Sequence, residues 1–142
     1  VFFTIGRFFR RYDASWMLLI ALLSSTARWA VTALFPENLP VMLIAQTAHA
    51  LGFAAFFAAA MQMLATYFPG RLNGHGQGLL YGFSSGVGGV RGALIAGQLW
   101  PIDQGRTAFL AGSGFALAGA LLCFFAISLP LLRAGRRKRA AV

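Results

Sequence analysis

"VMLIAQTAHALGFAAFFAAAMQMLAT", residues 41–66, carries no Asp, Glu, Lys or Arg and lies between Pro40 and Pro69. A helix of about 20 mostly apolar residues crosses a bilayer, so this stretch is long enough to do so. Three other stretches have the same character, at residues 16–35, 77–100 and 107–132. We therefore expect an all-α integral membrane protein with four transmembrane helices.

The composition of the whole chain agrees with a lipid environment. Of its 142 residues, 58% are hydrophobic and 11% are charged. Soluble domains carry about 25% charged residues, so this chain has too few charges to cover a surface that faces water. The four apolar stretches leave little sequence for a separate soluble domain.

The net charge of +9 is distributed unevenly along the chain. Glu37, Asp103 and Arg106 belong to the loops at one end of the predicted spans. The segments at the other end are strongly basic and carry Arg7, Arg10, Arg11, Arg71, Arg133, Arg136, Arg137, Lys138 and Arg139. Cytoplasmic loops of membrane proteins are rich in Lys and Arg, so we expect both ends of the chain in the cytoplasm and the protein in the cell (inner) membrane.

The basic tail has two possible kinds of partner, lipid and nucleic acid. No basic groove with interleaved aromatic residues accompanies it, so we interpret the tail as a topology signal and an anchor for lipid headgroups. We expect no nucleic-acid partner.

The chain divides into three predicted parts. Residues 1–15 begin with the apolar "VFFTIG" and continue into "RFFRRYD", which is typical of the end of a helix that enters a basic cytoplasmic loop. Residues 16–132 form the four-helix transmembrane part, and residues 133–142 form the basic cytoplasmic tail. We expect a carboxy-terminal fragment of a larger carrier, with the missing N-terminal helices as its partners.

No pattern in the sequence indicates an enzyme. Cys123 is the single cysteine and lies inside an apolar stretch, where packing is the simpler explanation. The "GVGGVRG" run lacks both the preceding strand and the Lys-Ser/Thr that a phosphate loop requires. No metal-ligand spacing or catalytic triad is present, so we expect no catalytic residue, cofactor or metal.

Three basic or ionisable side chains lie inside the predicted spans, namely Arg28, His49 and Arg91. At about 1.5 Å of rise per residue, each lies roughly 11–13 Å below the outer end of its helix. We expect them to share one level, as residues of a site between helices do. The alternatives are a neutral histidine bonded to a neighbouring helix and arginines that extend toward the headgroups.

Helical spacing places further polar and aromatic residues on the same faces. The third predicted span has the longest such stripe, which is typical of a helix that lines a water-filled cavity. The candidate residues for binding substrate or protons are Arg28, Gln46, His49, Phe53, Tyr81, Ser84 and Arg91.

Glycines recur at four-residue spacing in the third predicted span. Such ladders let helices approach closely, and glycine also permits bending. We interpret Gly78, Gly82, Gly86, Gly88 and Gly92 as helix-packing residues.

Three stretches, "ARWAVTA" (27–33), "AQTAHALGFAAFFAAAMQ" (45–62) and "GHGQGLLYGFSSGVGGVRGALIAGQLW" (74–100), resemble the last spans of major facilitator superfamily transporters. The similarity is strongest to the branch that contains the 3-phenylpropionate permease, and more distant to the lactose permease. The resemblance implies helices nine to twelve of a twelve-helix bundle. It also implies that Arg28 and His49 belong to the machinery that handles protons and substrate.

The sequence departs from those patterns at three positions. Gly52 stands where the sugar permease has a glutamate, Phe57 stands where the aromatic-acid branch has a second histidine, and Arg91 stands where that branch has a small residue. These departures bear on the coupling ion and on the substrate.

These features together predict a secondary active transporter, a proton-coupled permease for a small organic solute. An aromatic or other organic acid is favoured, because Arg28 and Arg91 supply positive charge while Phe53, Phe56 and Tyr81 supply apolar walls. The alternatives are a sugar or nucleoside symporter, and a non-transporting four-helix membrane subunit or decayed fragment.

Overall fold

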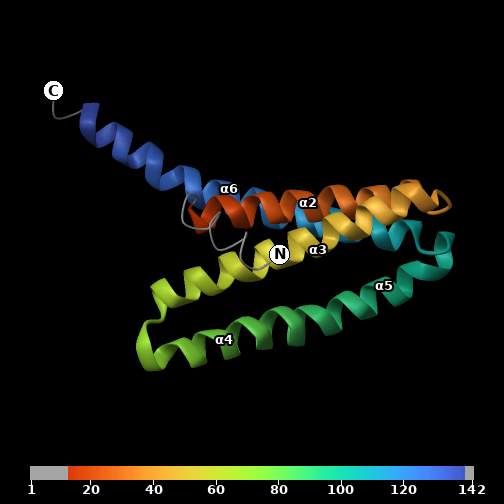
Figure 1. Cartoon of the computed structure of the whole chain (residues 1–142), viewed down its shortest axis with the longest axis horizontal. Helices are drawn as coiled ribbons and strands as arrows, with labels where there is room; N and C mark the ends of the chain where they lie inside the picture. The colour runs from red at the N-terminus through yellow and green to blue at the C-terminus, as the bar shows by residue number, and fades with distance from the viewer. Residues whose placement is uncertain (1–12, 140–142) are drawn as a thin grey trace.

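The computed structural model describes residues 13–139, all of whose regular elements are helices (Figure 1). Residues 1–12, which include most of the predicted basic loop, and residues 140–142 lie outside the described part. The elements in chain order are α2 (Ala14–Leu34), α3 (Leu39–Tyr67), a 3₁₀ turn (Gly70–Leu72), α4 (Asn73–Tyr81), a π-helical segment (Gly82–Gly88), α5 (Gly89–Asp103) and α6 (Arg106–Arg139).

Three of the described helices are long and apolar enough to cross a membrane: α2, α3 and the part of α6 from Arg106 to Ile127. These three helices begin within two residues of the predicted starts at 16, 41 and 107. Helix α6 continues through residues 133–139, which the sequence assigned to the tail.

The third predicted span, residues 77–100, is helical but is not one α-helix. Residues 73–103 form α4, the π segment Gly82–Gly88 and α5 in direct succession, and together we call them the third helical segment. Figure 1 shows this segment as one curved rod. The π winding divides it into pieces that are each shorter than a bilayer-crossing helix, so four spans remain a prediction.

Local signals in the loops explain where the helices begin and turn. Asn38 Oδ1 accepts the Val41 backbone N–H at 3.1 Å and caps α3, and Pro40 follows in the first turn, where its missing N–H costs nothing. Gln104 (φ 55°) and Gly105 (φ 99°) reverse the chain between α5 and α6. A Cβ on Gly105 would lie 2.6 Å from the Trp100 ring, so this turn requires glycine.

These turns place the loops at two opposite ends of the bundle (Figure 1). The loop between α2 and α3 and the turn between α5 and α6 share one end, whereas the connection between α3 and α4 lies at the other. The carboxy-terminal end of α6 extends beyond that second end. The grouping agrees with the one predicted from charge, and which end faces the cytoplasm stays a prediction.

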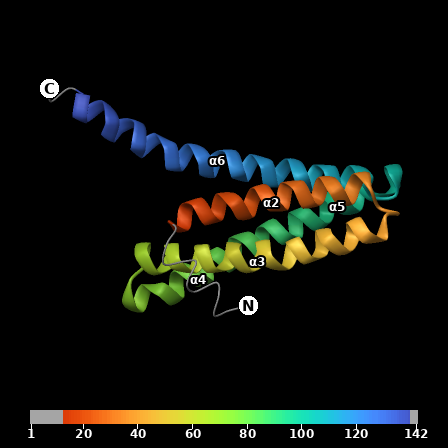
Figure 2. The ribbon, with the colours of Figure 1, turned by 45° about the horizontal axis from the view of Figure 1, so that its top comes forward.

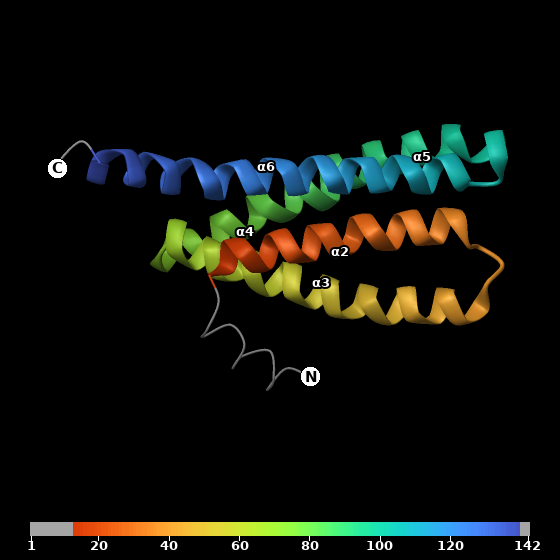
Figure 3. The ribbon, with the colours of Figure 1, turned by 90° about the horizontal axis from the view of Figure 1, so that it is seen from above.

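Helix α2 lies between α3 and α6 and packs on both (Figures 2 and 3). The contact with α3 uses small residues, with Ala59 completely buried, and with Ala14 and Met17 packed against Ala59. Met63 of α3 packs on the same cluster. Short side chains on α3 therefore let the two helices approach closely.

The contact between α2 and α6 also depends on small residues. Ser113 Oγ of α6 donates to the Thr26 carbonyl oxygen of α2 at 2.8 Å. About two turns further along α6, Gly119 lies against Leu22, with its Cβ position 3.7 Å from Leu22 Cδ2, and the next residue, Ala120, is 1% exposed. Close packing through small residues was predicted for the third span, whereas the fourth span, α6 here, was expected to pack against lipid and its neighbours, with no residues named.

Candidate functional site

Four rings form a continuous row on α3 and α4, which we call the aromatic row. The ring centroids of His49 and Phe53 lie 5.7 Å apart, those of Phe53 and Phe57 4.5 Å, and those of Phe57 and Tyr81 5.9 Å. Residues four apart lie on one face of a helix, which explains the order along α3. Tyr81, the last residue of α4, stacks on Phe57 with an interplanar angle of 22° and so joins the two helices.

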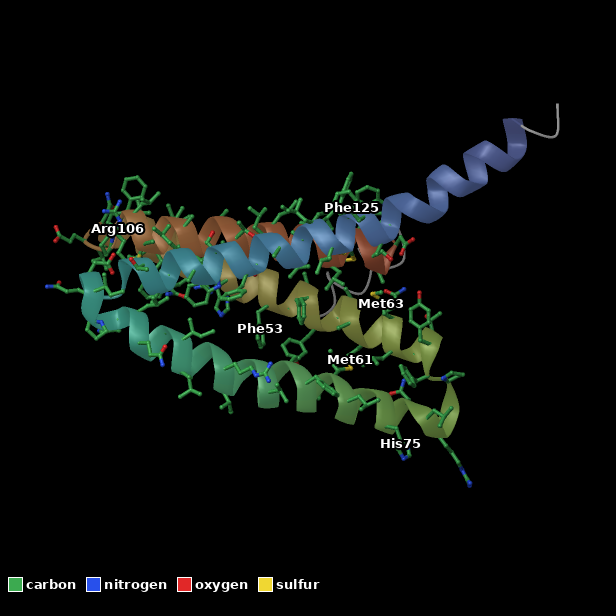
Figure 4. All side chains as sticks on the ribbon, turned by 180° about the vertical axis from the view of Figure 1, so that it is seen from behind. Phe53, Met61, Met63, His75, Arg106 and Phe125 are labelled. Carbon is green, nitrogen blue, oxygen red and sulfur yellow. The ribbon has the colours of Figure 1, made fainter. Side chains whose placement is uncertain are left out.

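The aromatic row is open to its surroundings in the described structure. Phe53 is 56% exposed and Tyr81 is 44% exposed, and His49 is also exposed. Figure 4 shows Phe53 and Met61 on the side of α3 that faces the third helical segment, whereas Met63 lies on the opposite side. Helix α3 therefore has one face packed on α2 and a second face that presents rings and an imidazole.

Three of the remaining polar candidates are exposed on α3 and on the third helical segment. Gln46 is exposed on α3, three residues before His49. Ser84 and Arg91 are exposed on the third helical segment. The Ser84 hydroxyl donates to the carbonyl oxygen of Leu80, at 2.5 Å, so it is engaged with its own helix.

Arg28 contacts a ring outside the aromatic row. Its Cζ lies 3.9 Å from the centroid of the adjacent Trp29 ring, which in turn stacks on Phe109 of α6 at 5.5 Å. A guanidinium over an indole face is stabilised by about 0.5–2 kcal/mol. The Arg28 Nε is buried and has no hydrogen-bond partner. The structure thus attaches Arg28 to Trp29 rather than to the aromatic row.

An apolar pocket of about 340 Å³ lies next to this contact, between α5 and α6. Four aromatic residues line it, Trp29, Trp100, Phe109 and Phe115, together with Ile95 and several alanines and glycines. This pocket was not predicted from the sequence. The available signal was the clustering of tryptophan and phenylalanine near the ends of two predicted spans, where aromatic residues gather at membrane interfaces.

The glycines predicted to pack helices together make no close contact with another helix in the described structure, although Gly92 lines the pocket between α5 and α6. A Cβ on Gly78, Gly82 or Gly92 would meet no other atom within 4 Å, apart from the nearby backbone of its own helix. A Cβ on Gly86 or Gly88 would meet only carbonyl oxygens of the same segment, Tyr81 O at 3.9 Å and Phe83 O at 3.2 Å. Their packing role stays a prediction, and it requires helices other than those described.

Negative charge is confined to the helix ends. The chain has three acidic residues. Asp13 caps α2, Glu37 lies in the loop before α3, and Asp103 ends α5. Arg28 and Arg91 therefore lie in helices whose interiors contain no carboxylate, and an interior cation without a partner is costly.

Comparison with known proteins identifies the family. No curated protein and no solved structure matches the chain. The family model described as "MFS_1 like family" matches residues 1–111, which is most of the chain. The all-helical architecture of the described residues is consistent with that match, and membership indicates a membrane transporter. The chain belongs to the MFS_1 like family, within the major facilitator superfamily.

Proposed function

We propose that this chain forms the last four membrane-spanning helices, nine to twelve, of a secondary active transporter for a small organic anion. In this proposal α2, α3, the third helical segment and α6 are those four helices, and the preceding helices of the same carrier cover the open face of α3. The family match and the resemblance to the 3-phenylpropionate permease branch support the assignment. The exposed glycines and polar residues of the third helical segment support it as well, because they lack packing partners among the described helices.

The observation that carries the choice of an anion is the exposed Arg91 on α5, in a chain whose three carboxylates all lie at helix ends. A guanidinium at membrane depth needs a negative partner, and a substrate carboxylate supplies one through charge-assisted hydrogen bonds. The aromatic row supplies apolar surface for the rest of the molecule. The substrate class is therefore an organic acid with an apolar body, and aromatic acids fit best.

His49 is the group that we assign to proton coupling. A histidine changes charge in the physiological pH range, and this one lies exposed at the start of the aromatic row. Protonation of His49 beside the path of the substrate would link the flux of protons to the flux of substrate. The proposal therefore includes the proton as the coupling ion.

The test replaces Arg91 by glutamine in the complete transporter, reconstituted in vesicles, and measures uptake of 3-phenylpropionate and of its neutral amide. Glutamine keeps much of the length but not the charge. Loss of a hydrogen bond to a charged group costs about 1.5–3 kcal/mol, so uptake of the acid should fall roughly 10-fold to 150-fold. Uptake of the amide should change much less.

Arg71→Gln is the matched control, because Arg71 is an exposed arginine in the 3₁₀ turn between α3 and α4. It should leave both uptakes close to those of the wild type. Equal losses of acid and amide in Arg91→Gln would show that Arg91 is a structural residue, and the anion assignment would then be wrong.

The proposed orientation places the loop at Glu37 outside the cell and the turn at Leu72 in the cytoplasm. Both residues are exposed, so single cysteines there should react readily with thiol reagents. In a Cys123→Ala background, an impermeant reagent added to intact cells should label Glu37→Cys and not Leu72→Cys. Labelling of Leu72→Cys and not of Glu37→Cys would show that the protein has the opposite orientation in the membrane.

A further inference from the structure

The π segment lies between two points at which the third helical segment is attached to the rest of the bundle. Before it, Tyr81 stacks on Phe57 of α3. After it, Trp100 of α5 meets Phe109 of α6 in an edge-to-face contact with centroids 6.0 Å apart. The residues between these attachments, from Gly82 to Ile95, are all exposed. The residues of this stretch can therefore change their winding without breaking a buried contact of their own, while the same change turns Trp100, further along α5, away from Phe109.

The side-chain hydrogen bond in this stretch permits both windings. In a π-helix each N–H bonds a carbonyl five residues earlier, instead of four, so one turn accommodates about one additional residue. The Ser84 hydroxyl donates to the Leu80 carbonyl oxygen, the atom that would accept the backbone N–H of residue 84 in an α-helix. The hydroxyls of Thr26, Thr32 and Thr47 make the same bond inside the α-helices α2 and α3, so this bond is compatible with either winding.

Glycine composition makes the backbone of this stretch easy to rearrange. Gly82, Gly86 and Gly88 lie in the π segment, and Gly89 begins α5. Glycine imposes no Cβ contacts on a changing backbone. The π segment therefore offers little steric resistance to a change of winding.

We propose that the π segment Gly82–Gly88 interconverts with α-helix during transport and thereby rotates α5, with Arg91, relative to α3. Converting one π turn to α-helix shifts the following residues by about one position, which is a rotation of roughly 100° and a translation of about 1.5 Å. Such a change gives Arg91 two discrete directions, as a two-state element in alternating access requires. The inference rests on the proposed function, because that function assigns Arg91 to the substrate carboxylate.

Deleting one residue from the π segment tests the proposal. Without Val87 an ordinary α-helix can join α4 to α5 in the orientation observed here, so α5 should be locked in place. The complete transporter should still bind 3-phenylpropionate within about threefold of the wild-type affinity, while its turnover falls at least about tenfold.

The matched control deletes Leu94, which lies in the α-helical part of the same segment. There the deletion rotates everything that follows by roughly 100° and removes Trp100 from Phe109. Converting the π segment to α-helix rotates α5 by about the same angle in the opposite sense and restores that contact, so deletion of Leu94, like deletion of Val87, should leave the thermal unfolding temperature close to that of the wild type. A clear loss of stability in either deletion would overturn the proposal.

A second measurement does not depend on any substrate. A Cβ on Gly88 would lie 3.2 Å from the Phe83 carbonyl oxygen in the π form, whereas one on Gly97 would meet nothing within 4 Å. Gly88→Ala should therefore favour α winding and Gly97→Ala should not. Single cysteines at Val90, Ala93 and Leu94, in a Cys123→Ala background, report the rotation through their rates of reaction with a water-soluble thiol reagent.

The order of those rates should change in Gly88→Ala by a shift of one residue and stay unchanged in Gly97→Ala. An unchanged order in Gly88→Ala would contradict the winding change. If the order shifts but neither the wild type nor any variant binds 3-phenylpropionate, the change in winding stands and the proposed substrate is wrong.

Discussion

The contact between α2 and α6 and the third helical segment contain similar small residues, and the structure uses them differently. On α6, the Cβ position of Gly112 lies 3.6 Å from the Trp29 ring and that of Gly119 lies 3.7 Å from Leu22. On the third helical segment, a Cβ on Gly78 would meet nothing within 4 Å, and Gly92 lines the apolar pocket that separates α5 from α6. Small residues at helical spacing show that another helix can approach closely, but they do not show that one does.

The difference arises from what the opposite helix presents. Helix α2 carries large side chains, Leu22 and Trp29, that fill the space left by the glycines of α6. No described side chain reaches within 4 Å of a Cβ on Gly78 or Gly92, and an apolar pocket lies between Gly92 and the rings of Trp29 and Phe109. The third helical segment is attached mainly at its ends, through rings, and its glycines between those ends accompany the π winding.

The largest expected effect comes from enlarging a small residue in the α2–α6 contact. Ala120 is 1% exposed, so Ala120→Leu should lower the free energy of unfolding by about 1–3 kcal/mol through overpacking. Thermal unfolding of the purified protein in detergent measures this loss.

Gly97→Leu on α5 is the control for Ala120→Leu, because a Cβ there meets no atom within 4 Å. It should leave the unfolding temperature nearly unchanged if the third helical segment is as open in solution as it is here. A loss equal to that of Ala120→Leu would remove the distinction between the two regions.

A smaller effect is expected from the hydrogen bond between these helices. Ser113→Ala removes the donor to the Thr26 carbonyl oxygen, and bonds of this kind average about 0.6 kcal/mol in membrane proteins. Thr47→Ala is the matched control, since the Thr47 hydroxyl donates at 2.9 Å to Leu43 of its own helix on an exposed face. Chemical or thermal unfolding should place Ser113→Ala below Thr47→Ala in stability, and the opposite order would contradict the importance of the α2–α6 contact.

The helices themselves were predictable from the sequence because the signal is local. Each predicted span is a run of apolar residues, and α2 and α3 begin and end within two residues of the predicted bounds. The division of residues 73–103 was not predicted. Hydropathy is the same for α and π winding, and glycine spacing is compatible with packing, bending or both.

The candidate site was predictable where one helix face decides it. His49 and Phe53 share a face of α3, and the structure adds Tyr81 of α4 to the same row. Phe57, which connects them, was missed as a site residue although its spacing of four from Phe53 was visible. The contact of Arg28 with Trp29 was not predicted, because helical spacing places neighbouring residues in different directions and only side-chain torsions bring them together.

The smallest expected effect concerns the turn between the third helical segment and α6, where the side chain of Asp103 caps the start of α6. Its carboxylate accepts the Thr107 hydroxyl at 2.6 Å and the Thr107 backbone N–H at 2.9 Å. The side-chain hydrogen bond is the main cause that lowers the pKa of Asp103 below its ordinary value, and the backbone bond adds to it. Because the pKa is lower in the folded protein, the stabilisation is complete above the unfolded pKa of about 3.9 and is lost as the pH falls through the folded value.

Thr107→Val removes the hydroxyl and should raise the pKa of Asp103 toward its ordinary value, whereas Thr107→Ser keeps the hydroxyl and should keep the pKa low. Titration of ¹³C-labelled aspartate by NMR measures both. The change in overall stability should be slight, since the carboxylate is exposed and water competes for it. The attachment of the third helical segment to α6 should then depend on Trp100 and Phe109 rather than on this turn. Equal pKa values for Asp103 in Thr107→Val and Thr107→Ser would show that the hydroxyl does not bond the carboxylate in solution. A large loss of stability in Thr107→Val would show that this turn, rather than Trp100 and Phe109, attaches the third helical segment to α6.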